Sequence, residues 1–224
     1  NPAYREDFAQ AAVWSRDPEA DLEKHRLYDQ RAAAWAYLQC DPGTVDQDLQ
    51  AAIRRAVLRR ADLFIEHCST MGYGFIRHPW APITWGTGAY QNWLDPLWWA
   101  YHLTGKDEYL AWIIRTCDNT LGANPLGISY ITGLGERTVR APLHNSRYSH
   151  FGEVVPGMQV QGPNQRGEGY RVQETAHPPL REDFANLYTF VDCHFAIAMN
   201  EGTIVNQARS LATFGLLLPD EPSR

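Results

Sequence analysis

The chain has 224 residues, enough for one large domain or for a piece of a larger one. A hydrophobic fraction of 44%, a charged fraction of 21% and a formal net charge of −6 are typical of a globular protein. They argue against nucleic-acid binding, which needs clustered lysine and arginine. No apolar run approaches the ~20 residues of a membrane span, so no membrane partner is expected. The chain begins with Asn1 rather than methionine, and we interpret it as a mature or truncated product.

Consecutive helices are predicted for residues 1–122. Asn1-Pro2 and Asp17-Pro18 are each typical of a helix start, and the second of these helices is expected to run to about Leu38. The stretch 44–47 resembles a capping box ahead of a helix whose apolar face comprises Leu49, Ile53, Val57, Ala61 and Phe64. The basic cluster on this helix is predicted to be a solvated face; its members are Arg54, Arg55, Arg59 and Arg60.

Two further helices are expected after a loop at residues 71–88 that is rich in glycine and proline. The first carries Trp98 at helical spacing with apolar neighbours, which predicts core packing for this ring, and it ends at Thr104-Gly105. The second is predicted to run from Asp107 to Leu121 and to end at a glycine. Short turns between successive helices indicate antiparallel helical hairpins.

The character of the sequence changes over residues 123–183, which are rich in Gly, Pro, Gln and Asn and have no sustained periodicity. A loop of this length inside a compact domain is usually functional or disordered, and the stretches "ISYITG" and "VVPGMQV" favour an ordered, functional loop. Final helices are predicted over residues 184–218, closed by Pro219. With no internal repeat and no linker, the chain is predicted to be a single all-α domain.

Cysteines and aromatic residues leave several possibilities open. The four cysteines are far apart in sequence and form no CxxC pair: Cys40, Cys68, Cys117 and Cys193. His67-Cys68 and Cys193-His194 are neighbours in sequence, and adjacent side chains on one element rarely bind one ion, so free or buried thiols are predicted. Tryptophans crowd into residues 80–99, where composition alone does not separate core packing from the stacking of rings on sugars.

Three stretches of the chain, in order, carry a family resemblance. They are "WGTGAYQN" at 85–92, "LGANPLGISYITGLGERTVRAPLHNSR" at 121–147 and "VDCHFAIAMNEGTIVNQA" at 191–208. Between the last two lies "VVPGMQVQGPN" at 154–164, which is similar to "VPGLLVGGPN". Their order and spacing over residues 80–217 resemble the C-terminal half of the catalytic domain of glycoside hydrolase family 9. The longest stretch is similar to the family pattern "LGxNPxGxSYVTGFGxxxxxxPHHR".

This resemblance implies both a fold and an activity. The implied fold is all-α, an (α/α)6 barrel or its C-terminal half, with residues 123–183 as irregular loops that line a cleft. The implied activity is hydrolysis, with inversion, of β-glycosidic bonds in a β-glucan such as cellulose. The implied partners are a polysaccharide or oligosaccharide substrate and the rest of the polypeptide. A secreted or periplasmic location and no cofactor are also implied; a structural calcium would belong to the full-length protein.

The same motifs imply individual site residues. The implied catalytic residues are Glu201, which corresponds to the family's general acid, and Asp192, which corresponds to the aspartate that accompanies it. The implied substrate-binding residues are His144, Arg147, Trp85 and Tyr148. Imidazole and guanidinium groups are natural donors to sugar hydroxyls, and the two aromatic rings are expected to stack on sugar faces. No metal ligands are implied.

Residue chemistry agrees with an acid at position 201. Glycoside hydrolysis needs one carboxylic acid that is protonated at the working pH. An apolar surround and a nearby like charge both favour the protonated form. The like charge is expected from Asp192, and the apolar residues that flank Glu201 in sequence are Met199, Ile204 and Val205. A simpler interpretation is a helix start at Asn200-Glu201, where a carboxylate meets the positive end of the helix dipole.

The sequence also departs from the family. Leu143 follows Pro142 where the family has histidine, so that His144 comes one position later. Ile197 stands in place of an aromatic residue, and Gln207 in place of an asparagine. These changes indicate an unusual specificity, either exo-acting or for a substituted sugar.

The catalytic base of the family lies in an Asp-any-any-Asp motif, and this sequence contains nothing similar. An inverting glycosidase needs that second carboxylate to activate water. We therefore interpret the chain as a fragment whose missing N-terminal segment supplies the base. Two alternatives stay open: a non-catalytic glycan-binding protein that keeps the barrel, and a different (α/α)6 enzyme such as an epimerase or lyase.

Overall fold

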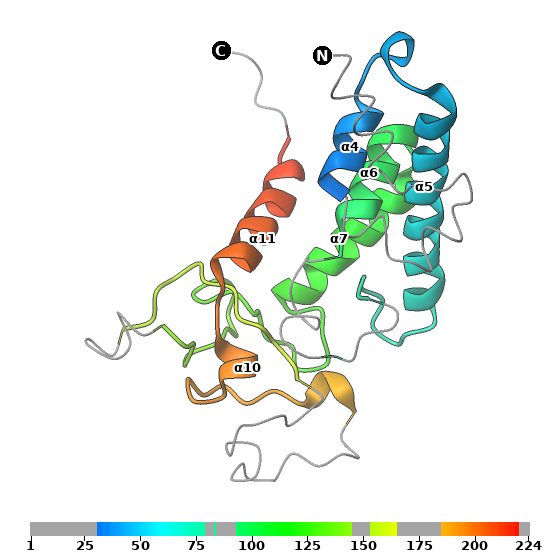
Figure 1. Ribbon diagram of the computed structural model, residues 1–224. Helices are drawn as coiled ribbons and strands as arrows, with labels where there is room; N and C mark the ends of the chain where they lie inside the picture. The colour runs from blue at the N-terminus through cyan, green and yellow to red at the C-terminus, as the bar shows by residue number, and fades with distance from the viewer. Residues whose placement is uncertain (1–30, 79–82, 84–92, 145–152, 165–184, 220–224) are drawn as a thin grey trace. The chain divides into compact units, whose positions relative to one another are not determined.

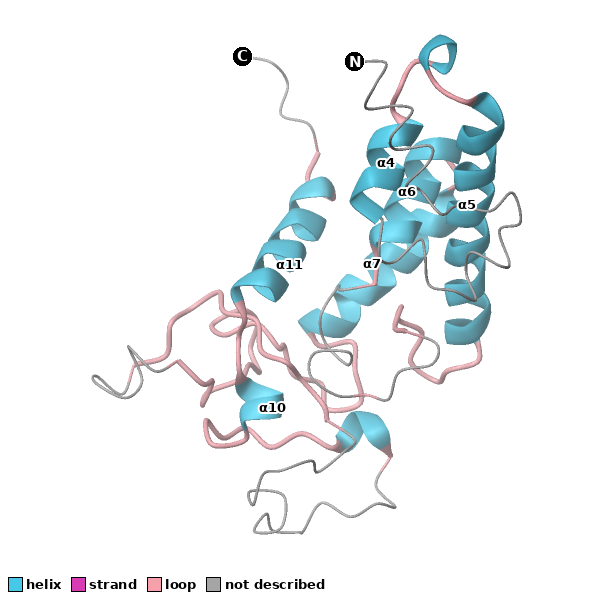
Figure 2. Cartoon of the chain, in the orientation of Figure 1, coloured by secondary structure: helices cyan, strands magenta, loops and turns pink. Residues whose placement is uncertain are grey.

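The computed structural model describes residues 31–78, 83, 93–144, 153–164 and 185–219 (Figure 1). Its α-helices are α4 (Arg31–Leu38), α5 (Gln47–Ser69), α6 (Asp95–Thr104), α7 (Asp107–Leu121), α10 (Ile197–Asn200) and α11 (Ile204–Leu216). Two short 3-10 helices are η1 (Pro42–Thr44) and η2 (Asn186–Tyr188). Within these ranges there is no β-strand, only isolated β-bridges (Figure 2). The predicted all-α class is confirmed.

The chain divides into two compact units. The first comprises Asn1–His67 and Asp95–Leu110, and the second comprises Cys68–Leu94 and Ala111–Arg224. In the first unit, α4, α5 and α6 pack around a core to which each contributes. The residues of this core and its edge include Ala34, Tyr37, Leu49, Ile53, Ala56, Val57, Trp99 and Leu103. Trp35 and Trp99 stack with ring centroids 5.3 Å apart, which joins α4 to α6.

The first turn of α5 differs from the predicted capping box. Thr44 belongs to η1, where its hydroxyl donates to the carbonyl of Asp41 at 2.7 Å. The cap is Asp46, whose Oδ1 accepts from the main-chain N–H groups of Asp48 at 3.0 Å and Leu49 at 3.1 Å. A carboxylate that satisfies two of the four free N–H groups is a stronger cap than a hydroxyl two residues earlier, so α5 begins at Gln47.

The predicted apolar face of α5 is confirmed, because Leu49, Ile53, Val57, Ala61 and Phe64 are all buried. The predicted solvated face is wrong at one position. Arg54 and Arg55 are exposed, but Arg60 is only 2% exposed, and its guanidinium carbon lies 5.0 Å from the ring centroid of Phe64. Residue 60 is four positions before Phe64, which places it on the buried side of the helix.

The helix ends on either side of α7 follow the predictions. Gly105 adopts a φ of +66° after α6, and Gly122 a φ of +125° after α7, conformations that favour glycine. Helix α7 spans Asp107–Leu121, as predicted. Trp98 is partly rather than completely buried on α6, next to the buried Leu97.

The four cysteines are free, as predicted. Cys68 and Cys117 are buried, whereas Cys40 is exposed. Burial raises the pKa of the Cys117 thiol to about 12, with a smaller contribution from the charge of Asp118. The part of the chain that the structure describes contains no cluster of three or more His, Cys, Asp or Glu residues suited to a metal ion. Nor does any described helix have the length and apolar character needed to cross a membrane.

Candidate active site

Besides its helices, the described part of the second unit consists of main-chain segments that bridge one another without forming a sheet. The segment from Ser129 to Thr132 pairs with Thr138 on one side and with Gln159 on the other. A small apolar cluster supports this arrangement: Tyr130, Val139 and Val160 are buried, and the ring of Phe190 meets that of Tyr130 edge-on at 5.5 Å. A further main-chain bridge of this kind involves Glu201, the predicted general acid.

Glu201 lies in the short break between α10 and α11. Its backbone is extended, with φ −70° and ψ 142°, and its N–H donates to the carbonyl of Ile197 as the last bond of α10. The next helix begins at Ile204, and its cap is Thr203, whose hydroxyl accepts from the N–H of Asn206. The predicted helix start at Asn200-Glu201 is therefore wrong, and the dipole of α11 does not account for a carboxylate at position 201.

Two segments hold the backbone of Glu201 from opposite sides. On one side, Leu143 forms a parallel bridge with Glu201, and its N–H donates to the carbonyl of Asn200 at 2.8 Å. On the other side, the N–H of Gln161 donates to the carbonyl of Glu201 at 3.1 Å. The N–H of Gly162 donates to the carbonyl of Met199 at 2.9 Å. Glu201 thus occupies a central, partly buried position.

The bridge also places the main chain of His144 close to that of Glu201, because His144 directly follows Leu143 in the chain. The residue paired with Glu201 is Leu143 itself, at the place after Pro142 where the family motif has histidine. The other predicted substrate-binding residues, Arg147, Tyr148 and Trp85, lie outside the described residues.

Asp192 holds the chain that leads to this bridge. Its Oδ2 accepts from the main-chain N–H of Arg140 and its Oδ1 from that of Ala141, each at 2.8 Å. Hydrogen bonds to an ionised carboxylate are stronger than neutral ones, so both oxygens act as anchors for the loop. Asp192 therefore holds the main chain at Arg140 and Ala141, shortly before Leu143.

Asn200 connects Asp192 to Glu201. It is completely buried, and its Nδ2 donates to the carbonyls of Val191 at 2.7 Å and Ala196 at 3.2 Å. Its own carbonyl accepts from Leu143. Hydrogen bonds thereby join the segments around residues 141, 192 and 200 in pairs, so that each segment is held by the other two.

The apolar surround predicted for Glu201 is present on one side only. Met199 is buried, but Ile204 is 88% exposed and Val205 is 60% exposed. The prediction is wrong for these two residues because Glu201 lies outside α11, and the first turn of that helix presents them to solvent.

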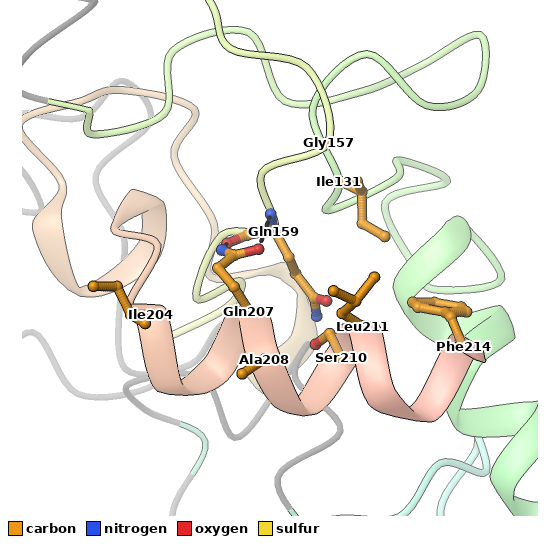
Figure 3. Close-up of a pocket in the computed structure, with 9 residues that line it drawn as sticks. All are labelled: Ile131, Gly157, Gln159, Ile204, Gln207, Ala208, Ser210, Leu211 and Phe214. Carbon is orange, nitrogen blue, oxygen red and sulfur yellow. Dashed lines mark hydrogen bonds between the residues drawn. The ribbon is translucent and has the colours of Figure 1, made fainter. Parts of the chain in front are cut away.

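Residues that the sequence did not single out as site residues complete the arrangement. The side-chain amide of Gln207 on α11 makes two hydrogen bonds to the main chain of Gln159: Oε1 accepts from its N–H at 3.0 Å, and Nε2 donates to its carbonyl. Figure 3 shows these side chains among those that line a pocket. The pocket is largely apolar and has a volume of about 510 Å³. The pocket is lined by Ile131, Gly157, Gln159, Ile204, Gln207, Ala208, Ser210, Leu211 and Phe214.

Comparison with known proteins assigns the family. Residues 30–214 match the profile of glycosyl hydrolase family 9, and the chain belongs to that family. It is 35% identical over 109 residues to the xyloglucan-specific endo-β-1,4-glucanase of Bacteroides ovatus, covering 48% of this chain and 17% of that protein. It is 27% identical over 167 residues to the cellulose 1,4-β-cellobiosidase of Acetivibrio thermocellus, covering 70% of this chain and 18% of that one.

Solved structures agree on the fold. The family 9 endoglucanase J30 superposes with a TM-score of 0.71 at 23% identity, over 84% of this chain and 34% of that one. A family 9 protein of Bacteroides ovatus superposes with a TM-score of 0.61 at 27% identity, over 80% and 31%. The fold is thus the all-α fold of the (α/α)6-barrel enzymes. The chain spans less than a fifth of the length of the two relatives named above and about a third of these solved chains.

Proposed function

We propose that this chain carries the acid side of the active site of a β-glucan hydrolase. In this proposal Glu201 protonates the oxygen of the leaving sugar. The observation that carries the proposal is the placement of Glu201 in a family 9 chain. It is partly buried in a break between two helices, and its backbone is held on one side by the Leu143 segment and on the other by Gln161. A general acid needs a fixed position of this kind, because proton donation depends on geometry.

Substrate binding falls to the loop that begins at Leu143. We propose that His144 and Arg147 donate hydrogen bonds to sugar hydroxyls and that Trp85 and Tyr148 stack on sugar rings. The clamp from Asp192 to the main chain at Arg140 and Ala141 supports this assignment for His144, since it fixes the start of the loop beside Glu201. Asp192 then acts on the substrate through the loop that it positions.

The base is proposed to come from a segment of the same polypeptide that precedes this chain, with inversion as the outcome. Two observations support a missing partner segment. The chain covers only about a third of the solved family 9 chains. In addition, α11 exposes apolar residues and buries polar ones: Ile204 is 88% exposed and Leu211 75%, seven positions apart and hence on one face, whereas Ser210 and Thr213 are buried. An exposed apolar helix face of this kind marks a contact surface.

The proposed substrate is a β-1,4-glucan, in keeping with the names of the two relatives, a xyloglucan-specific endo-β-1,4-glucanase and a cellulose 1,4-β-cellobiosidase. An extracellular site of action fits a polymer that is too large to enter a cell. A second candidate is a glycan-binding protein without catalysis, and the observation in its favour is the absence of an Asp-any-any-Asp motif from the 224 residues.

The test compares the full-length polypeptide with the isolated 224-residue chain. Both are incubated with cellulose oligosaccharides and xyloglucan, and the anomeric form of the first product is followed by NMR. We expect hydrolysis with inversion by the full-length protein only. Hydrolysis by the isolated chain, or retention, would contradict the proposal. Binding without hydrolysis by the full-length protein would favour the glycan-binding alternative.

A further inference from the structure

Gln207, on α11, lines the pocket and also bonds to the main chain of a neighbouring segment. Its side-chain amide pairs with the main chain of Gln159 through both a donor and an acceptor, as the backbone of a neighbouring strand would (Figure 3). A single polar side chain thereby bonds both the N–H and the carbonyl of one main-chain residue. The main-chain position of Gln159 is fixed relative to α11.

That segment leads directly to the acid. Two residues after Gln159, the N–H of Gln161 donates to the carbonyl of Glu201 at 3.1 Å, and the N–H of Gly162 donates to the carbonyl of Met199 at 2.9 Å. Gln207 therefore reaches Glu201 through one short, extended stretch of chain. A displacement of the main chain at Gln159 would move Gln161 and, through its hydrogen bond, the carbonyl of Glu201.

Gly202 provides a second and separate contact. A Cβ atom built on Gly202 would lie 2.8 Å from Nε2 of Gln207, 3.1 Å from the carbonyl oxygen of Gln159 and 3.0 Å from Cγ of Met158. The 2.8 Å approach is closer than real Cβ atoms come and the other two are tight, so a side chain at position 202 would require the Gln207 amide to shift. The amide of Gln207 thus packs directly against the residue that follows Glu201.

We propose that Gln207 is a positioning residue for Glu201, holding the backbone on both sides of the acid through Gln159 and Gly202. This inference rests on the proposed function, since it concerns the placement of the general acid. The Glu201 carboxyl must meet the leaving oxygen within hydrogen-bonding distance, and a misplacement of about 1 Å from a change away from the chemistry can cost ~10²-fold in rate. Gln207 itself does not touch the reacting atoms.

The test uses the full-length polypeptide with Gln207→Leu, which keeps similar volume and removes both hydrogen bonds. The matched control is Gln50→Leu in the first unit, because Nε2 of Gln50 also bonds to main-chain carbonyls, those of Tyr37 and Cys40, each at 3.1 Å. The value of kcat/KM is measured on a cellulose oligosaccharide and on a dinitrophenyl glycoside, whose good leaving group needs little protonation.

We expect Gln207→Leu to lower kcat/KM on the oligosaccharide by roughly ten- to a hundredfold and to change it little on the dinitrophenyl glycoside. Gln50→Leu should leave the ratio of the two values as in the wild type. In Gln207→Glu, kcat/KM on the oligosaccharide should be closer to the wild-type value at lower pH, because a protonated carboxyl can again donate to the carbonyl of Gln159. An equal loss on both substrates, or no loss, would overturn the positioning role.

Amide exchange gives a readout that needs no activity. In the full-length polypeptide, Gln207→Leu should speed exchange of the Gln161 N–H, which is hydrogen-bonded to the carbonyl of Glu201, and Gln50→Leu should not. Unchanged exchange at Gln161 would overturn the inference alone. An inactive wild-type protein would overturn the proposed function, and with it the role of Gln207 in catalysis, even if the exchange result were as expected.

Discussion

The core of the first unit and the surroundings of Glu201 are built on different principles. In the first unit, α4, α5 and α6 meet through apolar side chains at helical spacing. Around Glu201, the described segments meet through isolated bridges and through polar side chains that bond to main chain. Regular packing gives stability that depends on buried area, whereas irregular chain allows functional groups to be placed individually.

The two regions should therefore respond differently to substitution. Loss of apolar contacts should lower the free energy of unfolding and leave the geometry of Glu201 intact. Loss of one polar contact near Glu201 should have a smaller effect on unfolding but release a defined stretch of backbone, since each side chain there holds two main-chain groups.

The largest effect on stability is expected for Ile53→Ala. Ile53 is completely buried in the core of the first unit, so this change should lower the free energy of unfolding by about 2–5 kcal/mol. Urea unfolding followed by circular dichroism measures it. Ile114→Ala, at a side chain that is 43% exposed, is the control and should have a much smaller effect. Equal effects of the two changes would contradict the assignment of the core.

A smaller effect is expected for Asp192→Ala, which removes both acceptors of the clamp on Arg140 and Ala141. The free energy of unfolding should fall by about 1–2 kcal/mol, and exchange of these two amide protons should become faster. Asp192→Asn keeps one acceptor and should have an intermediate effect. If exchange at both amides stayed at the wild-type rate, Asp192 would not be the anchor of this loop.

Alkaline pH should destabilise the second unit through Cys117. Burial raises the pKa of this thiol from 9.0 to about 12. At a pH between these two pKa values, the thiol loses its proton in the unfolded chain and keeps it in the folded chain. The contribution of Cys117 to the free energy of unfolding is therefore complete below pH 9 and is lost as the pH rises above it. Unfolding midpoints at pH 8 and 10.5 should differ less in Cys117→Ala than in the wild type. Cys40→Ala, at an exposed thiol, should not reduce the difference.

The smallest effect in the isolated chain is expected for Leu211→Lys on the exposed face of α11, where the side chain is 75% exposed. The free energy of unfolding of the 224-residue chain, measured by thermal unfolding, should change by no more than about 0.5 kcal/mol. In the full-length protein the same change should be clearly destabilising, because the proposed partner segment would cover this face. An equally small effect in both proteins would count against such a segment.

The sequence allowed the regular part of the fold to be predicted well. Helix α7 has the predicted bounds, since Asp107 and Gly122 are local signals that act within one turn. The burial of Arg60 does not follow from the charge of its side chain, which predicts exposure; it follows from the four-residue spacing to Phe64. The start of α5 was misplaced by two residues, because Thr44 and Asp46 both resemble caps.

The candidate site was predicted by type but not by arrangement. Glu201 and His144 came from motif resemblance, which carries no information on how they are held. The contacts that hold them join residues about fifty positions apart, such as Asp192 with Ala141 and Gln207 with Gln159. No local pattern specifies such pairs, because they form only when the irregular segments have been brought together.

The central claim is that Glu201 is the general acid, and it is tested most directly by Glu201→Gln in the full-length protein. Glutamine keeps the volume and the hydrogen-bonding capacity but cannot donate the proton. We expect kcat on a cellulose oligosaccharide to fall by ~10²–10⁴-fold, with an unchanged unfolding midpoint and a smaller loss on a dinitrophenyl glycoside. Wild-type kcat in Glu201→Gln on the oligosaccharide would contradict the account.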